Sequence, residues 1–206
     1  MTDGVRGRLI AVEGSDGCGK STQARLLADA LGAVATFEPG ATELGASLRH
    51  LLLAPGAAPV SDRAEVLLLL ADRAQHLAEV VEPALASGRW VVTDRFSGST
   101  LAYQGAGREL PTDELRRLVD WATGGLVVDL NVLVDVPVEV GIARRFGEGP
   151  DRFEGLGTDF QRRVARGFRA QAEQGPPQWL VVDGDRPPGD VAADIVAGVR
   201  ARLGRA

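Results

Sequence analysis

The clearest chemistry in the chain lies in a glycine-rich segment that ends in a lysine and a serine. Residues 14–21 match the pattern G-x-x-x-x-G-K-S/T, between an apolar run and an amphipathic stretch. The glycines let backbone N–H groups turn inward around phosphates, Lys20 reaches the β and γ oxygens, and the Ser21 hydroxyl holds Mg²⁺. The pattern predicts nucleoside triphosphate binding, against the alternative of a strand–helix turn without a ligand. The residues expected to bind the nucleotide are Gly14, Ser15, Asp16, Gly17, Cys18, Gly19, Lys20, Ser21 and Thr22.

A second acidic and basic pair, Asp94 and Arg95, follows the apolar run at 90–94. A carboxylate at a strand end can lie near the Mg²⁺ ion, directly or through water, and Arg95 can stabilise charge on a transferring phosphoryl group. An ordinary ion pair is the alternative. A guanine-specifying N-K-x-D motif is absent, and the sequence VVDGDRP (181–187) stands in its place. The missing motif therefore argues against GTP and favours ATP, with the adenine expected along the backbone of that later segment.

The phosphate-binding segment also holds an acid, Asp16, where a polyanion is expected. At an effective dielectric of about 20, two like unit charges about 4 Å apart repel by about 4 kcal/mol. Lys20, Mg²⁺ and Arg95 must therefore offset this carboxylate, or it must lie further off. The alternative is that Asp16 only caps the turn.

Five short apolar runs predict the strands that position these residues. They span 8–13, 33–38, 90–94, 130–136 and 179–184, and each is continuous rather than alternating, as in a parallel sheet buried on both faces. Helical stretches separate them at 20–31, 60–87, 111–122, 137–146, 159–173 and 189–203. We expect an α/β fold in one domain over residues 1–206, a P-loop NTPase-type doubly wound five-stranded parallel sheet flanked by helices. The carboxyl ends of its strands then gather 14–21, 38–42, 94–104 and 183–185.

A polar, glycine-rich segment at 144–157 reads RRFGEGPDRFEGLG. We expect a short mobile lid that brings its arginines over a phosphate, and a plain surface loop is the alternative.

Composition limits the partners and the compartment. The net charge of −5 argues against a nucleic acid polymer as partner. No apolar run is long enough to span a membrane, and the first residues lack the apolar core of a signal peptide. One cysteine excludes an internal disulfide framework and a cysteine-based zinc site. We expect a cytoplasmic enzyme, with Trp90, Trp121 and Trp179 in its core and His50 and His76 in surface or packing roles.

Taken together, these residues resemble the thymidylate kinase family along nearly the whole chain. The matching segments are EGSDGCGKSTQ (13–23), TFEPGATELGASLRHLLL (36–53), LLLADRAQH (68–76) and DRFSGSTLAYQGAGREL (94–110). The resemblance implies a nucleoside monophosphate kinase that phosphorylates dTMP to dTDP in dTTP biosynthesis. ATP and Mg²⁺ are the implied cofactors, and a homodimer, with the apolar face of 60–87 as a candidate interface, is the implied assembly.

The resemblance also implies roles for individual residues. Asp16 accepts a hydrogen bond from the 3′-hydroxyl of the acceptor, Tyr103 packs on the deoxyribose, and Arg73 lies by the thymine edge. The implied catalytic residues are Lys20, Asp94, Arg95, Arg144 and Arg152, and the implied metal-binding residues are Ser21, Asp94 and Glu38. The implied substrate-binding residues are Asp16, Glu38, Pro39, Arg49, Leu69, Arg73, Arg95, Ser99, Thr100, Tyr103 and Gln104. Cys18 in place of a loop arginine, with arginines in the lid, resembles the bacterial branch.

Four residues depart from the family's pattern: Phe37, Ala41, Phe96 and Leu69. Leu69 stands where an aromatic side chain usually stacks on thymine, and stacking of a base on an aromatic ring is worth about 1–3 kcal/mol in single-strand binding. Two alternatives therefore stay open at this point. One is a related deoxynucleotide or deoxynucleoside kinase with altered base preference, and the other is a nucleotide-binding paralogue with little turnover.

Overall fold

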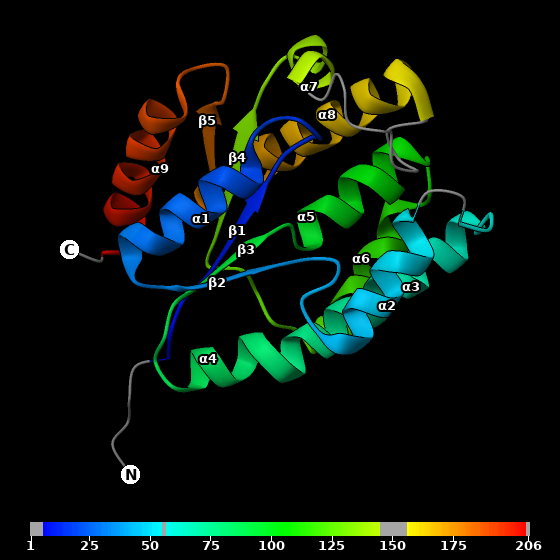
Figure 1. Cartoon of the computed structure of the whole chain (residues 1–206), viewed down its shortest axis with the longest axis horizontal. Coiled ribbons are helices and arrows are strands. Elements are labelled where there is room, and N and C mark those ends of the chain that lie inside the picture. The colour runs from blue at the N-terminus through cyan, green and yellow to red at the C-terminus, as the bar shows by residue number, and fades with distance from the viewer. Residues whose placement is uncertain (1–5, 55–56, 145–155, 205–206) are drawn as a thin grey trace.

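The computed structural model describes residues 6–54, 57–144 and 156–204 (Figure 1). Most of the expected lid, including Arg145 and Arg152, lies outside the described residues. Within these three ranges, no helix combines the length and hydropathy needed to cross a membrane.

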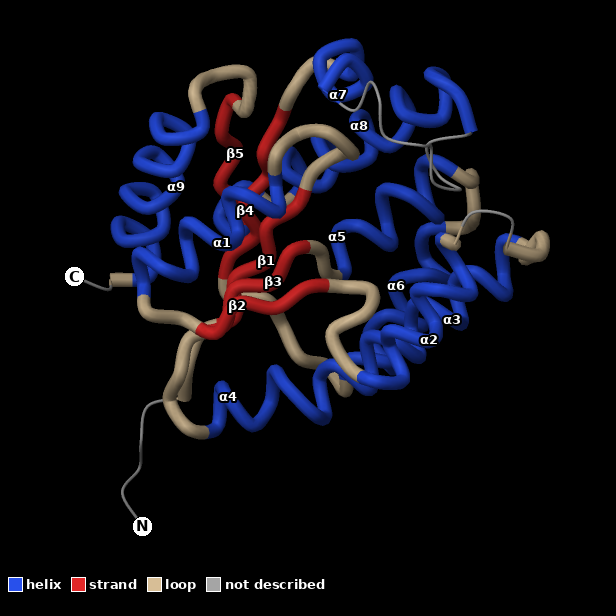
Figure 2. Tube along the Cα trace, viewed as in Figure 1, coloured by secondary structure: helices blue, strands red, loops and turns tan. Residues whose placement is uncertain are grey.

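A five-stranded, all-parallel sheet forms the centre of the molecule (Figure 2). The order is β2-β3-β1-β4-β5, and the strands are β1 (Leu9–Glu13), β2 (Val34–Phe37), β3 (Val91–Asp94), β4 (Leu130–Asp135) and β5 (Trp179–Asp183). Asp94 pairs with Val12 on one side and with Phe37 on the other. The carboxyl ends of three neighbouring strands therefore meet at one edge, and the predicted fold class is confirmed.

Helices cover both faces of the sheet. On one face, Ile10 and Val12 pack with α1 (Lys20–Leu31) and α9 (Pro188–Leu203). On the other, Leu9 and Ala11 pack under α4 (Glu82–Ala86), and α8 (Gly157–Gln174) packs over β4 beside it. Alternate residues of β1 are thus buried on opposite faces, as its continuous apolar run predicts. The edge strand β2 differs, because every second side chain is exposed there.

The long helix expected at 60–87 forms in three joined pieces. These are α3 (Asp62–His76), a π-helical stretch (Leu77–Val81) and α4. Two further helices are α2 (Glu43–Leu53), capped by the Thr42 side chain, and α6 (Thr112–Thr123). Trp121 on α6 is 83% exposed, so its expected place in the core is wrong. The residue lies on the outward face of an amphipathic helix, away from the sheet.

A helix also carries residues 97–107, which the sequence analysis treated only as a segment after a strand. It begins as α5 (Ser97–Thr100) and continues as a π-helical stretch (Leu101–Gly107) that packs against α8. The shorter α7 (Val138–Arg144) follows β4, and a 3₁₀ turn (Pro176–Gln178) precedes β5. The helical geometry places Ser99, Thr100, Tyr103 and Gln104 toward the carboxyl edge of the sheet.

Candidate active site

A cavity of about 1120 Å³ opens at the carboxyl ends of the strands and brings the predicted site residues together. Residues from the phosphate-binding segment, the ends of β2 and β3, and helices α2, α3, α5 and α7 line it. The predicted residues that line it are Asp16, Gly17, Gly19, Lys20, Ser21, Thr22, Glu38, Pro39, Arg49, Leu69, Arg73, Asp94, Arg95, Ser99, Thr100, Tyr103, Gln104 and Arg144. The cavity lining does not include Gly14, Ser15 or Cys18. Arg152 lies outside the described residues.

The phosphate-binding segment needs glycine where its backbone turns. Gly17 has a φ of +78°, and a Cβ there would lie 2.1 Å from the carbonyl oxygen of Gly141 in α7. Gly19 has a φ of +91° and caps the N-terminus of α1. These conformations favour glycine because other residues rarely adopt them. The backbone therefore forms a turn whose N–H groups and helix end attract an anion.

Asp16 lies between two cations, as its place beside a polyanion requires. Its Oδ1 is 3.4 Å from Lys20 Nζ and also pairs with Arg95 Nη2. Arg95 Nη2 donates to the Tyr103 hydroxyl at 3.2 Å, and the guanidinium lies over the Tyr103 ring. These contacts turn the Asp16 carboxylate toward Arg95 at the end of β3 and toward the helical segment that follows it.

Asp94 provides an acceptor that none of the described residues uses. Its Oδ1 is buried and has no hydrogen-bond partner among the described residues. A buried acceptor without a hydrogen bond costs free energy of folding unless a ligand or water supplies the missing partner. A carboxylate oxygen is a ligand that suits Mg²⁺. Asp94 and the exposed Ser21 line the same cavity, so these residues fit a Mg²⁺ ion bound partly by nucleotide phosphates. Within the described ranges, no group of three or more acidic, histidine or cysteine side chains forms a metal cage by itself.

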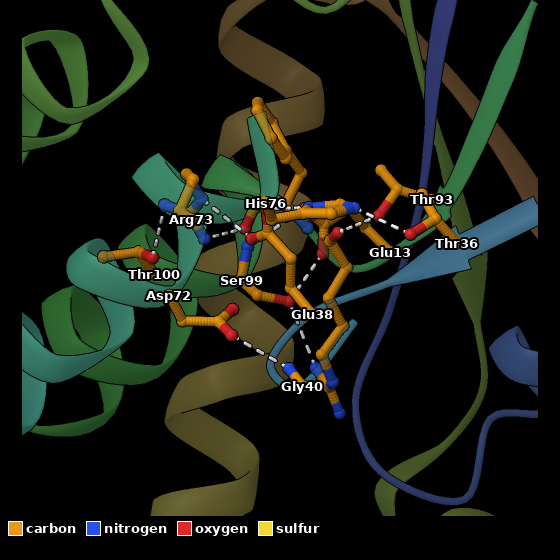
Figure 3. Close-up of polar contacts among 12 residues, drawn as sticks. Glu13, Thr36, Glu38, Gly40, Asp72, Arg73, His76, Thr93, Ser99 and Thr100 are labelled. Carbon is orange, nitrogen blue, oxygen red and sulfur yellow. Dashed lines mark hydrogen bonds and ion pairs between the residues drawn. The ribbon is translucent and has the colours of Figure 1, made fainter. Parts of the chain in front are cut away.

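Glu38 is engaged by two other side chains rather than free (Figure 3). Its Oε2 accepts from Arg73 Nε at 2.8 Å, and its Oε1 lies 2.9 Å from His76 Nδ1. The other ring nitrogen of His76 lies 2.7 Å from the Thr36 hydroxyl on β2. His76 is fully buried and belongs to this network, which the sequence analysis missed. Its spacing of three from Arg73 on one helix was the available signal.

Asp72, beside Arg73 on α3, is hydrogen-bonded to the segment that follows β2. Its Oδ1 accepts the Gly40 N–H at 2.9 Å. Burial, and next the charge of Glu38, raise the pKa of Asp72 to about 6. No local sequence pattern indicated Asp72, because its partner is a backbone group 32 positions away.

Three of the residues expected to bind the substrate, Ser99, Thr100 and Gln104, are each hydrogen-bonded within the protein. Ser99 donates its hydroxyl to Glu13, Thr100 accepts from Arg73 Nη1 at 3.0 Å, and Gln104 donates to the buried Glu65 at 3.0 Å. Leu69 is half-buried at the cavity wall rather than in the core. This part of the cavity thus combines an aliphatic wall with polar side chains that are already hydrogen-bonded.

Arg144 contacts the segment 181–187, along which the adenine is expected to lie. Its Nη1 donates to the Gly184 carbonyl at 3.1 Å and its Nη2 to Asp185 Oδ1 at 3.0 Å. Because Arg144 also lines the cavity, it joins the start of the expected lid to the segment after β5.

Cys18 is buried, and burial raises the pKa of its thiol. A thiol of this kind is less reactive because little thiolate forms near neutral pH.

Comparisons with known proteins agree along the chain. The family model described as thymidylate kinase matches residues 12–195. A thymidylate kinase of Chromobacterium violaceum is 48% identical over 197 residues, covering 93% of this chain and 92% of that protein. A thymidylate kinase of Prochlorococcus marinus strain MIT 9313 is 45% identical over 211 residues, covering 97% of each chain. The crystal structure of thymidylate kinase from Ehrlichia chaffeensis has a TM-score of 0.79 at 28% identity, and covers 95% of this chain and 99% of that chain.

Proposed function

The chain belongs to the thymidylate kinase family, and we propose that it transfers the γ-phosphoryl group of ATP to dTMP, forming dTDP for dTTP biosynthesis. The observation that carries this proposal is a single cavity with a phosphate-binding turn at one side and the Asp16–Arg95–Tyr103 group at the other. The first side suits a triphosphate, and the second suits a deoxynucleotide monophosphate. Relatives named thymidylate kinase are 41–50% identical to this chain over most of the length of both proteins, and this supports dTMP as the acceptor over a kinase with altered base preference.

Catalysis rests on positioning and charge stabilisation. The attacking oxygen belongs to a phosphate that is already ionised at neutral pH, so no strong general base is required. Lys20 binds the β- and γ-phosphate oxygens of ATP, and Arg95 stabilises the charge on the phosphoryl group as it is transferred. Asp16, held by both cations, orients the acceptor through its 3′-hydroxyl.

Ser21 and Asp94 are the residues we assign to Mg²⁺, because one hydroxyl is exposed to the cavity and one carboxylate oxygen is unpartnered. When bound, the ion neutralises phosphate charge and aligns the donor. Glu38 has both oxygens engaged by Arg73 and His76, so we assign it the role of holding Arg73 rather than that of a direct ligand.

The acceptor base lies against Leu69, with Arg73 along its edge and Ser99, Thr100 and Gln104 within reach. Tyr103, packed edge-on against Phe160 and Phe168, is held where a ribose 2′-hydroxyl would project. Pro39 and Arg49 both line the cavity, and we assign them to the acceptor phosphate; Arg49 Nη1 donates to the Pro39 carbonyl at 2.9 Å, which holds the two together. A rigid tyrosine at this place favours deoxynucleotides.

To residues 144–157, most of which lie outside the described part of the chain, we assign the role of a lid that supplies Arg144 and Arg152 and limits ATP hydrolysis by excluding water. The enzyme works in the cytoplasm as a homodimer. Exposed Leu67 on α3, next to α2 with its exposed Leu44 and Leu51, supports an interface at this side of the molecule.

Direct detection of product tests the proposal. Purified protein is incubated with ATP, Mg²⁺ and dTMP, and dTDP is separated and quantified by ion-exchange chromatography. We expect dTDP to form with the wild-type protein, and Lys20→Ala to lower kcat by about 100-fold or more, because removing one charge-stabilising donor costs about that much. Arg8→Ala, which loses only an exposed pair at the opposite end of β1, is the matched control. Binding of ATP without dTDP formation would contradict the proposal and support the paralogue with little turnover.

A further inference from the structure

Glu13, the last residue of β1, carries a carboxylate to which the reaction outlined above gives no role. Its side chain is fully buried, directly before the phosphate-binding segment. A buried carboxylate has lost the water that stabilises its charge, so it must find donors inside the protein. The identity of those donors therefore indicates what the side chain does.

Among the residues that the structure describes, every hydrogen-bond donor to Glu13 comes from the start of one helix. Oε1 accepts the Phe96 N–H at 3.0 Å and the Ser99 N–H at 3.1 Å, and Oε2 accepts the Ser99 hydroxyl at 2.6 Å (Figure 3). The approach is close, because a Cβ on Gly98 would lie 2.8 Å from Glu13 Oε1. Glu13 thus joins the end of β1 to the first turn after β3.

That turn begins with Arg95, whose backbone is in an uncommon conformation. Arg95 has a φ of +73° and is one of two non-glycine residues with positive φ in the described part of the chain. Such a conformation persists only where its surroundings hold it. Arg95 N–H donates to the Val12 carbonyl at 3.0 Å, Thr93 donates its hydroxyl to the Arg95 carbonyl at 2.9 Å, and Glu13 holds the next N–H along the chain.

Glu13 also reaches the Arg95 guanidinium through one hydroxyl. Ser99 donates its hydroxyl hydrogen to Glu13, so its oxygen is left to accept from Arg95 Nη1 at 3.1 Å. The Nη2 group is then directed to Asp16 and Tyr103. The carboxylate therefore acts on both ends of Arg95, on its backbone through Phe96 and on its guanidinium through Ser99.

We propose that Glu13 is a positioning residue for catalysis, which aims the Arg95 guanidinium at the transferring phosphoryl group by fixing the first turn of α5 and the direction of the Ser99 hydroxyl. This inference rests on the proposed function, in which Arg95 stabilises the phosphoryl group. Glu13 itself touches neither nucleotide. Its removal should therefore lower kcat through Arg95 and leave the binding of ATP largely unchanged.

A double-mutant cycle with Arg95 tests the inference. Glu13→Gln and Ser99→Ala are each made in the wild-type protein and in Arg95→Ala, and kcat and the KM values for ATP and dTMP are measured from dTDP formation. With Arg95 present, we expect each variant to lower kcat by about 10- to 100-fold, since small misplacement of a catalytic group costs about that much. The KM for ATP should change by less than about twofold. In Arg95→Ala, we expect neither change to lower kcat by more than about twofold, because coupled residues are not additive.

Asp129→Asn is the matched control, because Asp129 accepts the Leu9 N–H at 2.8 Å at the opposite end of the same strand. It should lower thermal stability and leave kcat unchanged. An equal loss of kcat with and without Arg95, or an unchanged kcat in folded Glu13→Gln, overturns the inference. If Glu13→Gln does not fold, the Ser99→Ala cycle decides alone, because Ser99→Ala keeps both backbone hydrogen bonds to Glu13. A wild-type protein that forms no dTDP refutes the proposed function first, before any variant is compared.

Discussion

Lys20 is the only lysine among the 206 residues, and arginine or histidine supplies all other basic side chains. It is buried, lines the cavity and pairs with Asp16 on the preceding turn. A lysine is a compact point charge, whereas arginine binds through a planar fork, so the two are not equivalent beside a triphosphate. At the residue scale, the cavity is therefore lined by one ammonium group, which we assign to the donor, and by several guanidinium groups.

This division predicts a labelling experiment that needs no variant enzyme. An amine-reactive ester can modify only Lys20 and the terminal amine, and peptide mass spectrometry separates the two. Saturating ATP with Mg²⁺ should slow modification of Lys20 by about tenfold or more, because protection follows the fraction of sites occupied. The terminal amine serves as the internal control. Labelling of Lys20 at the same rate with and without ATP would contradict its placement at the phosphates.

Glu13 predicts how stability depends on pH. Burial raises the pKa of Glu13 from 4.5 to about 7, against the lowering effects of Ser99 and Arg95. The folded protein then holds this proton more tightly than the unfolded chain. Its contribution to the free energy of unfolding is therefore full below pH 4.5 and is lost as the pH rises through about 7. The raised pKa of Asp72 acts in the same direction.

Glu13→Gln removes this titration. We expect the free energy of unfolding of the wild-type protein to fall between about pH 4.5 and pH 7.5, and the fall to be smaller in Glu13→Gln by up to about 3 kcal/mol. Urea unfolding of both proteins at several pH values measures these free energies. Parallel pH dependences of the two proteins would show that Glu13 does not titrate in this range.

At the scale of elements, the phosphate-binding turn packs closely against a neighbouring helix, α7. The missing side chain of Gly17 leaves room for the Gly141 carbonyl of α7, so the turn and this helix are in direct backbone contact.

Gly17→Ala is predicted to disrupt that contact. The new Cβ would lie 2.1 Å from the Gly141 oxygen at a φ of +78°. We expect a loss of about 2 kcal/mol or more in the free energy of unfolding, from backbone strain together with overpacking. Gly189→Ala in α9, with no atom within 4 Å of its Cβ, should be nearly neutral and is the control. Equal stability of the two variants in urea unfolding would refute this account of the turn.

Local patterns predicted the five strands, most helices and the phosphate-binding turn, because each depends on a short run of residues. The helix at 97–107 was not expected, because its glycine- and serine-rich start has low helix propensity. That start is held by a hydrogen bond from the Phe96 N–H to Glu13, which lies 83 positions earlier in the chain. Buried polar pairs were missed for the same reason. Glu13, Asp72 and His76 each find partners more than 30 positions distant, and no local pattern indicates such pairs.

At the scale of the whole molecule, the sheet separates two different sides. Figure 1 shows α9 and β5 at one side and α2, α3 and α6 grouped at the other. That second side carries exposed Leu44, Leu51 and Leu67, with Leu118 and Trp121 on α6. Apolar side chains gathered on neighbouring helices are typical of an interface between subunits.

Sedimentation velocity tests the proposed homodimer. We expect the wild-type protein, with a chain mass of 21.7 kDa, to sediment as a dimer at micromolar concentration. Leu67→Glu, which places a charge where 59% of a leucine is exposed, should shift it toward monomer. Val181→Glu, on β5 at the other side, should leave the assembly unchanged. A monomeric wild-type protein, or equal effects of both substitutions, would contradict an interface that includes α3.

The acceptor preference tests the central claim most directly. The measurement is kcat/KM for dTMP, dUMP, TMP and dCMP, with thymidine as a control, in a coupled assay of ADP formation from ATP with Mg²⁺. We predict the highest value for dTMP, a clear loss for TMP because Tyr103 occupies the space of a 2′-hydroxyl, and no reaction with thymidine, which lacks the phosphate that accepts the transfer. A higher kcat/KM for dCMP or another acceptor than for dTMP would contradict the assignment of this cavity to thymidylate.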